Sequence, residues 1–330
     1  MSNLEESVEI TVCGGVAVQT EPVFELLPPR KVELTPRLRG ADQADPITVS
    51  RYLPTRGRRM VGAWCFVDYY GPDDVGGSRG MQVPPHPHCG LQTVSWLLAG
   101  EVLHRDSIGS VQVISPGQLN LMTAGRGIAH AETSVQQSGE VLHGLQLWVA
   151  LPETELRRAA EFQHLADVPH WRTDGLDASV LLGTLAEITS PASTFTPIVG
   201  ADIAIGPAAH STIPLRSDWE YAALVLAGEV VLDGRSRLRS ADMAYLGCAR
   251  SQLSVATGDH ARLLLLGGEP FDEEILMWWN FVGRTHEDIV AARTDWMSGS
   301  RFGAVTTYDG APLPAPPMPA VRLKPRGRAT

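Results

Sequence analysis

Short apolar segments, separated by turns rich in glycine and proline, dominate the chain. The clearest strand candidates are residues 91–98, 111–114, 119–122, 142–149, 222–226, 230–232, 243–246 and 261–266. Turn signals such as Ser115-Pro116-Gly117 and Asp233-Gly234 separate them roughly every 8 to 12 residues. This spacing is typical of an all-β sandwich or barrel.

Two segments predict helices. Residues 153–161 are rich in Glu, Arg and Ala. The other helix covers about residues 287–297, where Thr285 can cap the first turn and Asp288 completes the spacing of a capping box.

The two ends of the chain differ from the rest. Residues 1–27 predict a loosely ordered extension. Residues 311–330 are proline-rich and basic, and we expect an extended or disordered tail there rather than part of a core.

One five-residue sequence occurs twice. LAGEV at residues 98–102 returns letter for letter at residues 226–230, each time with a strand before it and a strand after it. Such self-similarity predicts two copies of one unit. We therefore expect an N-terminal extension (1–30), a first barrel (31–160), a second barrel (161–310) and a tail (311–330).

Composition narrows the function classes. At 330 residues the chain is long enough for two domains, and 27 basic against 37 acidic residues give a net charge of −10. That charge argues against direct binding to nucleic acid or to an anionic membrane.

Cysteine use and hydropathy predict the compartment. Cys13, Cys65, Cys89 and Cys248 are scattered without a Cys-x-x-Cys pair, which favours a reducing interior. The first residues carry no signal-peptide pattern, and no apolar run reaches the roughly 18 to 20 residues of a membrane span. We expect a soluble, cytoplasmic protein.

Two ligand-x-ligand pairs are the main candidate chemistry: His86 and His88, then His130 and Glu132. Residues i and i+2 of a strand point to the same face, roughly 6.5–7 Å apart at the backbone, so both can reach one ion. Two such strands facing each other inside a barrel would hold one divalent transition metal with four ligands. The alternative is a set of ordinary histidines in turns and on strand faces.

The repeat gives an internal comparison. The positions of the second copy that match His86 and His88 are Pro214 and Arg216, and the region that matches His130 and Glu132 lies near residues 254–256. Neither place offers ligands. We therefore expect the second barrel to lack a metal site.

Several long blocks resemble the pirin family, a branch of the cupin superfamily. They are GRRMVGAWCFVDYYGP (57–72), HPHCGLQTVSWLLAG (86–100), PGQLNLMTAGRGIAHAE (116–132), LHGLQLWVALP (142–152) and FVGRTHEDIVAARTDWMSGSRFG (281–303). The resemblance is dense over about residues 50–165 and looser over 200–303.

The resemblance implies an all-β fold of two cupin (jelly-roll) β-barrels in tandem, with a few short helices and one mononuclear metal site in the N-terminal barrel. The family's ligands fall on His86, His88, His130 and Glu132, all present here. Iron, as Fe(II), is the usual family metal, and such a site would also accept Ni, Co, Cu, Mn or Zn.

Two residues differ from those that are usual at the same positions of related sequences. Cys89 stands where Arg is common, and it is either a redox-sensitive thiol or a small buried hydrophobe. Gln92 replaces the glutamate of the general cupin motif, which we expect to change the charge around the ligands.

Two further histidines lie outside the ligand pairs. His143 either orients a ligand or is a satisfied core histidine. His104-Arg105-Asp106 spells the kinase catalytic-loop triplet, but without the kinase Asn spacing or Gly-rich loop it is assigned no role.

Two functions follow as hypotheses. The first is a dioxygenase similar to the quercetin 2,3-dioxygenases among bacterial pirins, acting on a small planar flavonol or another enolic or phenolic compound with O₂. The three histidines would hold the metal, while Glu132 would both bind it and accept the substrate's proton as the catalytic base. The second is a metal-containing regulator that binds a transcription factor or metabolic enzyme without catalysis.

Overall fold

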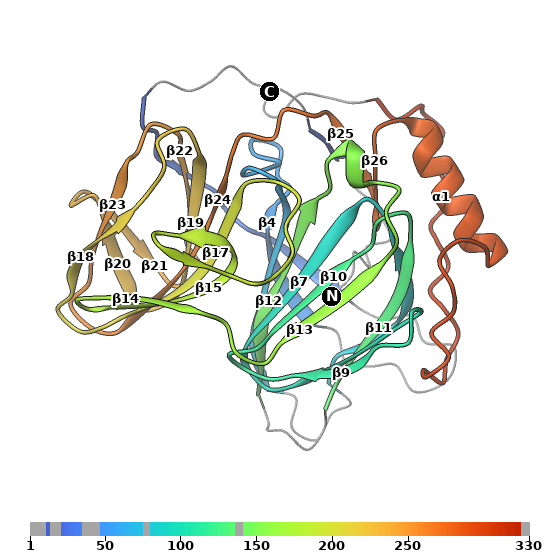
Figure 1. The fold of residues 1–330 in the computed structure, drawn as a ribbon, viewed down its shortest axis with the longest axis horizontal. Coiled ribbons are helices and arrows are strands. Elements are labelled where there is room, and N and C mark those ends of the chain that lie inside the picture. Colours follow the sequence, from blue (N-terminus) through green and yellow to red (C-terminus); the bar gives the residue numbers. More distant parts are fainter. Residues whose placement is uncertain (1–10, 14–20, 35–46, 75–79, 136–140, 325–330) are drawn as a thin grey trace.

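The computed structural model describes residues 11–13, 21–34, 47–74, 80–135 and 141–324. The predicted all-β fold of two cupin-type barrels is confirmed: the barrels lie side by side, and one α-helix covers the outer side of the first barrel (Figure 1). Within the described residues, no helix is long and apolar enough to cross a membrane.

The first barrel pairs a seven-stranded sheet with a four-stranded sheet. In the larger sheet the order is β13 (Glu161–Leu165), β10 (Leu119–Thr123), β7 (Leu91–Ala99), β12 (Val141–Ala150), β5 (Trp64–Asp74), β4 (Ile47–Leu53) and β3 (Arg30–Leu34). In the smaller sheet it is β6 (Gln82–His88), β11 (Ile128–Ser134), β8 (Val102–Asp106) and β9 (Val111–Ile114).

The second barrel repeats this plan. Its larger sheet runs β14 (His170–Thr173), β15 (Leu176–Leu185), β17 (Ile198–Ile205), β24 (Ala261–Gly268), β19 (Glu220–Ala227), β22 (Met243–Gly247) and β2 (Glu25–Leu26), with β16 (Ile188–Thr189) paired to β15. Its smaller sheet runs β18 (His210–Pro214), β23 (Gln252–Ala256), β20 (Glu229–Leu232) and β21 (Ser236–Arg239). A third, small sheet contains β1 (Thr11–Cys13), β25 (Ile275–Trp278) and β26 (Phe281–Gly283).

The LAGEV repeat occupies the same turn in both barrels. Gly100 joins β7 to β8 with φ 78°, and Gly228 joins β19 to β20 with φ 74°. A Cβ on Gly100 would lie 2.6 Å from the carbonyl oxygen of Val141, and one on Gly228 would lie 2.5 Å from that of His260. Both turns therefore need glycine, which explains why the repeat is preserved there.

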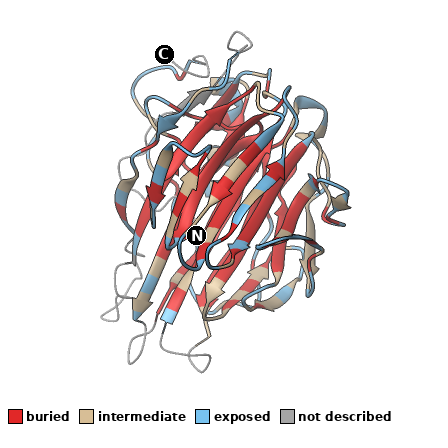
Figure 2. Cartoon of the chain, turned by 90° about the vertical axis from the view of Figure 1, so that its left-hand side faces the viewer, coloured by how far each residue is buried: buried red, intermediate tan, exposed pale blue. Residues whose placement is uncertain are grey.

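The strands are buried along most of their length, while exposed residues gather in the turns (Figure 2). Strands covered on both faces read as nearly continuous apolar runs. The run Leu263–Leu266 in β24 is an example, since all four of its side chains are buried. This is why the apolar segments of the sequence located the strands so well.

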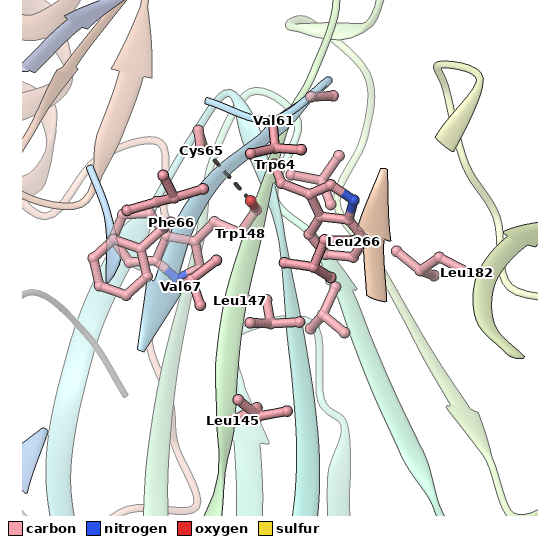
Figure 3. Close-up of a cluster of buried hydrophobic side chains, with 14 of the residues drawn as sticks. Val61, Trp64, Cys65, Phe66, Val67, Leu145, Leu147, Trp148, Leu182 and Leu266 are labelled. Atoms are coloured by element: carbon pink, nitrogen blue, oxygen red, sulfur yellow. Dashed lines mark hydrogen bonds between the residues drawn. The ribbon is translucent and has the colours of Figure 1, made fainter. Parts of the chain in front are cut away.

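The two barrels share one core. Leu182 and Leu266 of the second barrel belong to the same cluster as Val61, Trp64 and Leu147 of the first (Figure 3). The indole Nε1–H of Trp64 donates to the carbonyl oxygens of Val199 and Gly267, at 3.1 and 3.2 Å. Its donor is thus satisfied in the middle of the interface, as a buried Trp requires.

One predicted helix is confirmed and the other is wrong. Helix α1 (His286–Ser298) begins at Thr285 with the predicted capping box and ends at Gly299 in the left-handed conformation. Residues 153–161 contain only a 3₁₀ turn, η1 (Glu153–Glu155), and then enter β13. The turn buries no residue, and a helix without an apolar face gains nothing from packing.

Segments from both ends pack onto the barrels. Strand β2, from the predicted extension, pairs with β22 of the second barrel, and Leu27 beside it is buried. The predicted tail is extended, but it also belongs to a core, because Leu313, Ala315 and Leu323 are buried in a cluster with α1. The tail packs because apolar side chains stand between its prolines and can be buried. The division at residues 30, 160 and 310 stays a proposal.

Candidate metal centre

The four candidate ligands lie on two neighbouring strands, β6 and β11. His86 and His88 are on β6, His130 and Glu132 are on β11, and all four are buried. The two strands pair antiparallel, with His130 opposite His86. The two predicted strands are thus direct neighbours in one sheet of the barrel, where paired residues bring their Cβ atoms to about 4.5–5.5 Å, close enough for one ion.

A β-bulge adjusts this pair of strands. The register of β11 against β6 shifts between His130 and Glu132, so Glu132 pairs with Val83 rather than with the residue two before His86. Bulges bend a strand and re-aim its side chains, and they are frequent beside functional sites.

The three imidazoles form a triangle. Ring centroids are 4.3 Å apart for His86 and His130, and 5.0 Å apart for both pairs that include His88. One nitrogen of each ring lies within 4.8 Å of the others. Three ligands on one ion would lie at comparable separations, because each nitrogen sits about 2.0–2.2 Å from the metal.

Each ring presents a nitrogen without a hydrogen-bond partner among the described residues. These are the Nε2 atoms of His86, His88 and His130, all buried. The Nδ1–H of His86 donates to the carbonyl oxygen of Pro84 at 2.9 Å, which leaves the lone pair on Nε2. Buried polar atoms are almost always paired in proteins, so this convergent set fits a metal ion.

Burial also keeps the rings neutral. It lowers the pKa of His86 to about 4 and holds the pKa values of His88 and His130 well below the ordinary value. A histidine must be deprotonated to bind a metal. At neutral pH all three rings are ready to do so.

Proline makes β6 suitable as an edge strand. Pro84, Pro85 and Pro87 lack backbone donors, and among the strands that the structure describes β6 forms a ladder with β11 alone. On the outer face of β11, Ala129 and Ala131 alternate with the ligands and pack against the cluster formed with α1 and the tail. This packing supports β11, which carries two of the candidate ligands, on its outer face.

His104 and Asp106 join the site, which the sequence reasoning missed. They lie on β8, the other neighbour of β11, where Glu132 pairs with His104 and His130 pairs with Asp106. One ligand atom each from His104, His130 and Glu132 lies within 4.8 Å of the others. The signal was available, because His104-x-Asp106 is a third ligand-x-ligand pair.

Glu132 faces the larger sheet. The Oγ of Ser95 on β7 lies 3.4 Å from Oε1 of Glu132 and 3.1 Å from Oε1 of Gln146 on β12. The aromatic wall nearby comes from Trp148, whose ring meets His88 edge-on at 5.1 Å and stacks on Phe66 at 4.0 Å. The ligands thus have a polar neighbour on one side and an apolar one on another.

Family models match both barrels. The Pirin family model matches residues 47–149, and the model of the Pirin C-terminal cupin domain matches residues 200–303. The chain belongs to the pirin family.

Two curated relatives and one solved structure are similar to this pirin over most of its length. It is 44% identical over 320 residues to PA1205 of Pseudomonas aeruginosa, provisionally named a quercetin 2,3-dioxygenase, covering 97% of this chain and 98% of the relative. It is 33% identical to human Pirin over 68% of this chain and 79% of that one. A crystal structure of quercetin 2,3-dioxygenase from Acinetobacter baumannii matches with a TM-score of 0.82 and 39% identity, covering 90% of this chain and 96% of that one.

Gln92 and His143 have hydrogen-bond partners away from the candidate ligands of this pirin. The side-chain amide of Gln92 donates to Thr123 and to the carbonyl oxygen of Ser193, outside the first barrel. Ser95 contacts Glu132, so Gln92, three residues before it on the same strand, points to the opposite face. The expected change of charge around the ligands is wrong. His143 pairs with the hydroxyl of Tyr69 at 2.7 Å, which supports the core-histidine alternative.

Cys89 follows the candidate ligand His88 but turns away from it. Its side chain is buried among Phe281, Trp278 and Ala129, and burial raises the pKa of the thiol to about 11. A thiol in that environment reacts poorly, which supports the small-hydrophobe alternative.

The corresponding sheet of the second barrel is filled with apolar side chains. Ile213 on β18 pairs with Leu253 on β23, and both are fully buried together with Val255. Pro214, the match to His86, is exposed at the end of β18. The scaffold is retained while its interior is packed in the manner of an ordinary core.

Proposed function

We propose that this pirin is a metal-dependent dioxygenase that cleaves flavonols such as quercetin, with one metal held by His86, His88, His130 and Glu132. The observation that carries the proposal is the set of three buried Nε2 atoms without hydrogen-bond partners among the described residues. Similarity to PA1205 over nearly the whole of both chains, and to the quercetin 2,3-dioxygenase of A. baumannii, supports the choice of reaction.

The donor set suits the metal. Three imidazoles and a carboxylate accept Fe(II), which we propose as the resident ion, and also Ni, Co, Cu, Mn or Zn. When bound, the metal supplies a Lewis acid that makes a coordinated hydroxyl group more acidic.

Glu132 is the proposed proton acceptor. Its carboxylate lies beside His104 and His130, and Ser95 Oγ is 3.4 Å from Oε1. A carboxylate in that place can receive the proton of the flavonol hydroxyl. Trp148 meets His88 edge-on and stacks on Phe66 with ring centroids 4.0 Å apart, so the wall beside the proposed ligands is aromatic.

The test is oxygen consumption by protein loaded separately with each of the six metals. We expect flavonol-dependent O₂ uptake with release of carbon monoxide, lost in His88→Ala and reduced at least about 100-fold in Glu132→Gln. Glu220→Gln is the matched control: Glu220 is also buried, but it binds Tyr245 and Gly62 at the barrel interface. That variant should keep its activity.

If no metal supported turnover, the dioxygenase proposal would be wrong. If the protein without turnover still bound a metal, and His88→Ala altered its capture of a transcription factor or metabolic enzyme, the result would support the metal-containing regulator instead.

A further inference from the structure

A histidine–carboxylate pair stands directly behind the ligand His130. Nδ1 of His104 lies 3.4 Å from Nδ1 of His130, and Nε2 of His104 lies 3.1 Å from Oδ2 of Asp106. His104 and Asp106 are each only 3% exposed. The three side chains therefore form a buried line from a carboxylate, through one imidazole, to a second imidazole.

The proton positions along this line follow from the carboxylate. Asp106 only accepts hydrogen bonds, so Nε2 of His104 must carry the proton that it donates. In a neutral ring Nδ1 of His104 is then an acceptor, and Nδ1 of His130 must donate to it. The lone pair of His130 is consequently on Nε2, the buried atom without a partner among the described residues.

Asp106 is fixed in this orientation. Its other oxygen, Oδ1, accepts the backbone N–H groups of Ile108 and Ser110, at 3.1 and 2.9 Å. The ring of His104 is held as well, because it stacks on Phe162 with centroids 4.4 Å apart and planes 15° apart. Neither group can rotate without losing contacts that the fold supplies.

We propose that Asp106 and His104 are positioning residues that orient His130 and keep its proton on Nδ1, so that Nε2 is the metal ligand. Outer hydrogen bonds of this kind fix the tautomer of a ligating histidine and typically change metal affinity about 10- to 100-fold when removed. The inference rests on the metal centre of the proposed function and not on the dioxygenase reaction.

The competing assignment makes His104 itself a ligand, because its ring is close to His130 and Glu132. The contacts favour the positioning role. Nε2 of His104 faces Asp106 and Nδ1 faces His130, so both nitrogens already have partners.

The isosteric change Asp106→Asn is the sharpest test. The two backbone N–H groups keep the amide oxygen at the Oδ1 position, so the amide NH₂ must face His104. His104 then accepts at Nε2 and carries its proton on Nδ1, and His130 is forced to place its proton on Nε2. We expect the affinity for Co(II), measured by competition with a chromophoric chelator, to fall about 10- to 100-fold.

Substitutions of His104 separate positioning from ligation. The Oδ1 of Asn lies near the place of a histidine Nδ1, so His104→Asn keeps an acceptor for His130, whereas His104→Leu removes it. We expect Co(II) affinity close to wild type in His104→Asn and a loss of about 10- to 100-fold in His104→Leu. The d–d absorption of Co(II) should keep its intensity in His104→Asn, because the ligands are unchanged.

Asp202→Asn is the matched control. Asp202 is equally buried, but it binds Arg262 and Trp96 at the interface between the barrels. It should bind Co(II) as wild type does. Circular dichroism and thermal unfolding of the apoproteins test that each variant folds, so that a loss of affinity reports the site.

Three outcomes overturn parts of this picture, and they are distinguishable. Wild-type affinity and spectrum in Asp106→Asn would refute the positioning role. Weaker Co(II) binding in both His104→Asn and His104→Leu, with a changed absorption spectrum of the Co(II) that still binds, would make His104 a ligand instead. Failure of the wild-type protein to bind Co(II) at all would remove the metal centre, and the proposed function with it.

Discussion

His130 lies opposite His86 in the antiparallel pair of β11 and β6, and their ring centroids are 4.3 Å apart. In an unbound site, neutral rings at this distance leave two buried acceptor nitrogens beside each other. A metal ion relieves that arrangement by binding both lone pairs at once. Metal binding should therefore stabilise the folded state strongly.

Metal addition should raise the free energy of unfolding. At a free Co(II) concentration of 100 times its dissociation constant, the increase should be about 2.7 kcal/mol, because the ion binds the folded state alone. Urea unfolding with Co(II) and with excess chelator measures it. His88→Ala should show no such increase, and an equal increase in that variant would contradict the assignment of His88.

The candidate ligands could be found in the sequence because their signal is local. Residues two apart in a strand share a face, so His86 with His88, and His130 with Glu132, could be recognised from spacing alone. Which strands then lie beside each other is decided by non-local pairing, and no local pattern encodes the register of β6 against β11. The sequence therefore predicts the two pairs of side chains but not that their strands are direct neighbours in one sheet.

His104 and the tail were missed for a different reason. The triplet at residues 104–106 spells a kinase motif, and His104 and Asp106 reach the site only because β8 lies beside β11, a pairing that no local pattern encodes. The tail is rich in proline, which indicates an extended chain correctly. Whether such a chain packs depends on a partner surface, here α1 and the outer face of β11.

The paired glycines of the repeat should respond alike to substitution. Gly100→Ala and Gly228→Ala each combine a left-handed backbone with a Cβ within 2.6 Å of a carbonyl oxygen. We expect each to cost at least about 2 kcal/mol of unfolding free energy. Gly234→Ala is the control, because its φ of 63° carries the backbone strain while nothing lies within 4 Å of the added Cβ. Equal losses in all three would show that the close contacts do not matter.

Cys89 should be inert in the folded protein. Burial raises the pKa of its thiol to about 11, so almost none is thiolate at pH 7.5. Iodoacetamide followed by mass spectrometry should leave Cys89 unmodified in native protein and label it in urea. Cys89→Ala should keep wild-type affinity for Co(II). Rapid native labelling, or oxidation that releases the metal, would instead support a redox-sensitive thiol.

The tail should support the ligand strands from outside. Leu313 is 9% exposed, its N–H donates to Pro85 at 2.8 Å, and its carbonyl oxygen accepts the indole N–H of Trp296. Leu313→Ala should cost about 2 kcal/mol or more and speed hydrogen exchange in β6 and β11. Val321→Ala, at a position 63% exposed, should change stability by less than about 0.5 kcal/mol. Unchanged exchange in β6 after Leu313→Ala would show that the tail does not restrain the site.

The cap of α1 should give stability that depends on pH. Oδ2 of Asp288 accepts the backbone N–H groups of Arg284 and Thr285, at 2.9 and 2.8 Å. Burial alone would raise the pKa of Asp288, but these hydrogen bonds outweigh it and hold the pKa below the ordinary value. A carboxyl group whose pKa is lower in the folded state stabilises the fold fully above its unfolded pKa, and this contribution is lost as the pH falls through the folded value.

Asp288→Ala should therefore cost about 1 kcal/mol between pH 5 and pH 8. The difference from wild type should begin to shrink below about pH 4, where the carboxyl group takes up a proton in the unfolded state, and should disappear only below the lower pKa of the folded state. Urea unfolding followed by circular dichroism at several pH values measures it. A difference that stays constant down to pH 3 would show that the capping hydrogen bonds do not depend on the charge of Asp288.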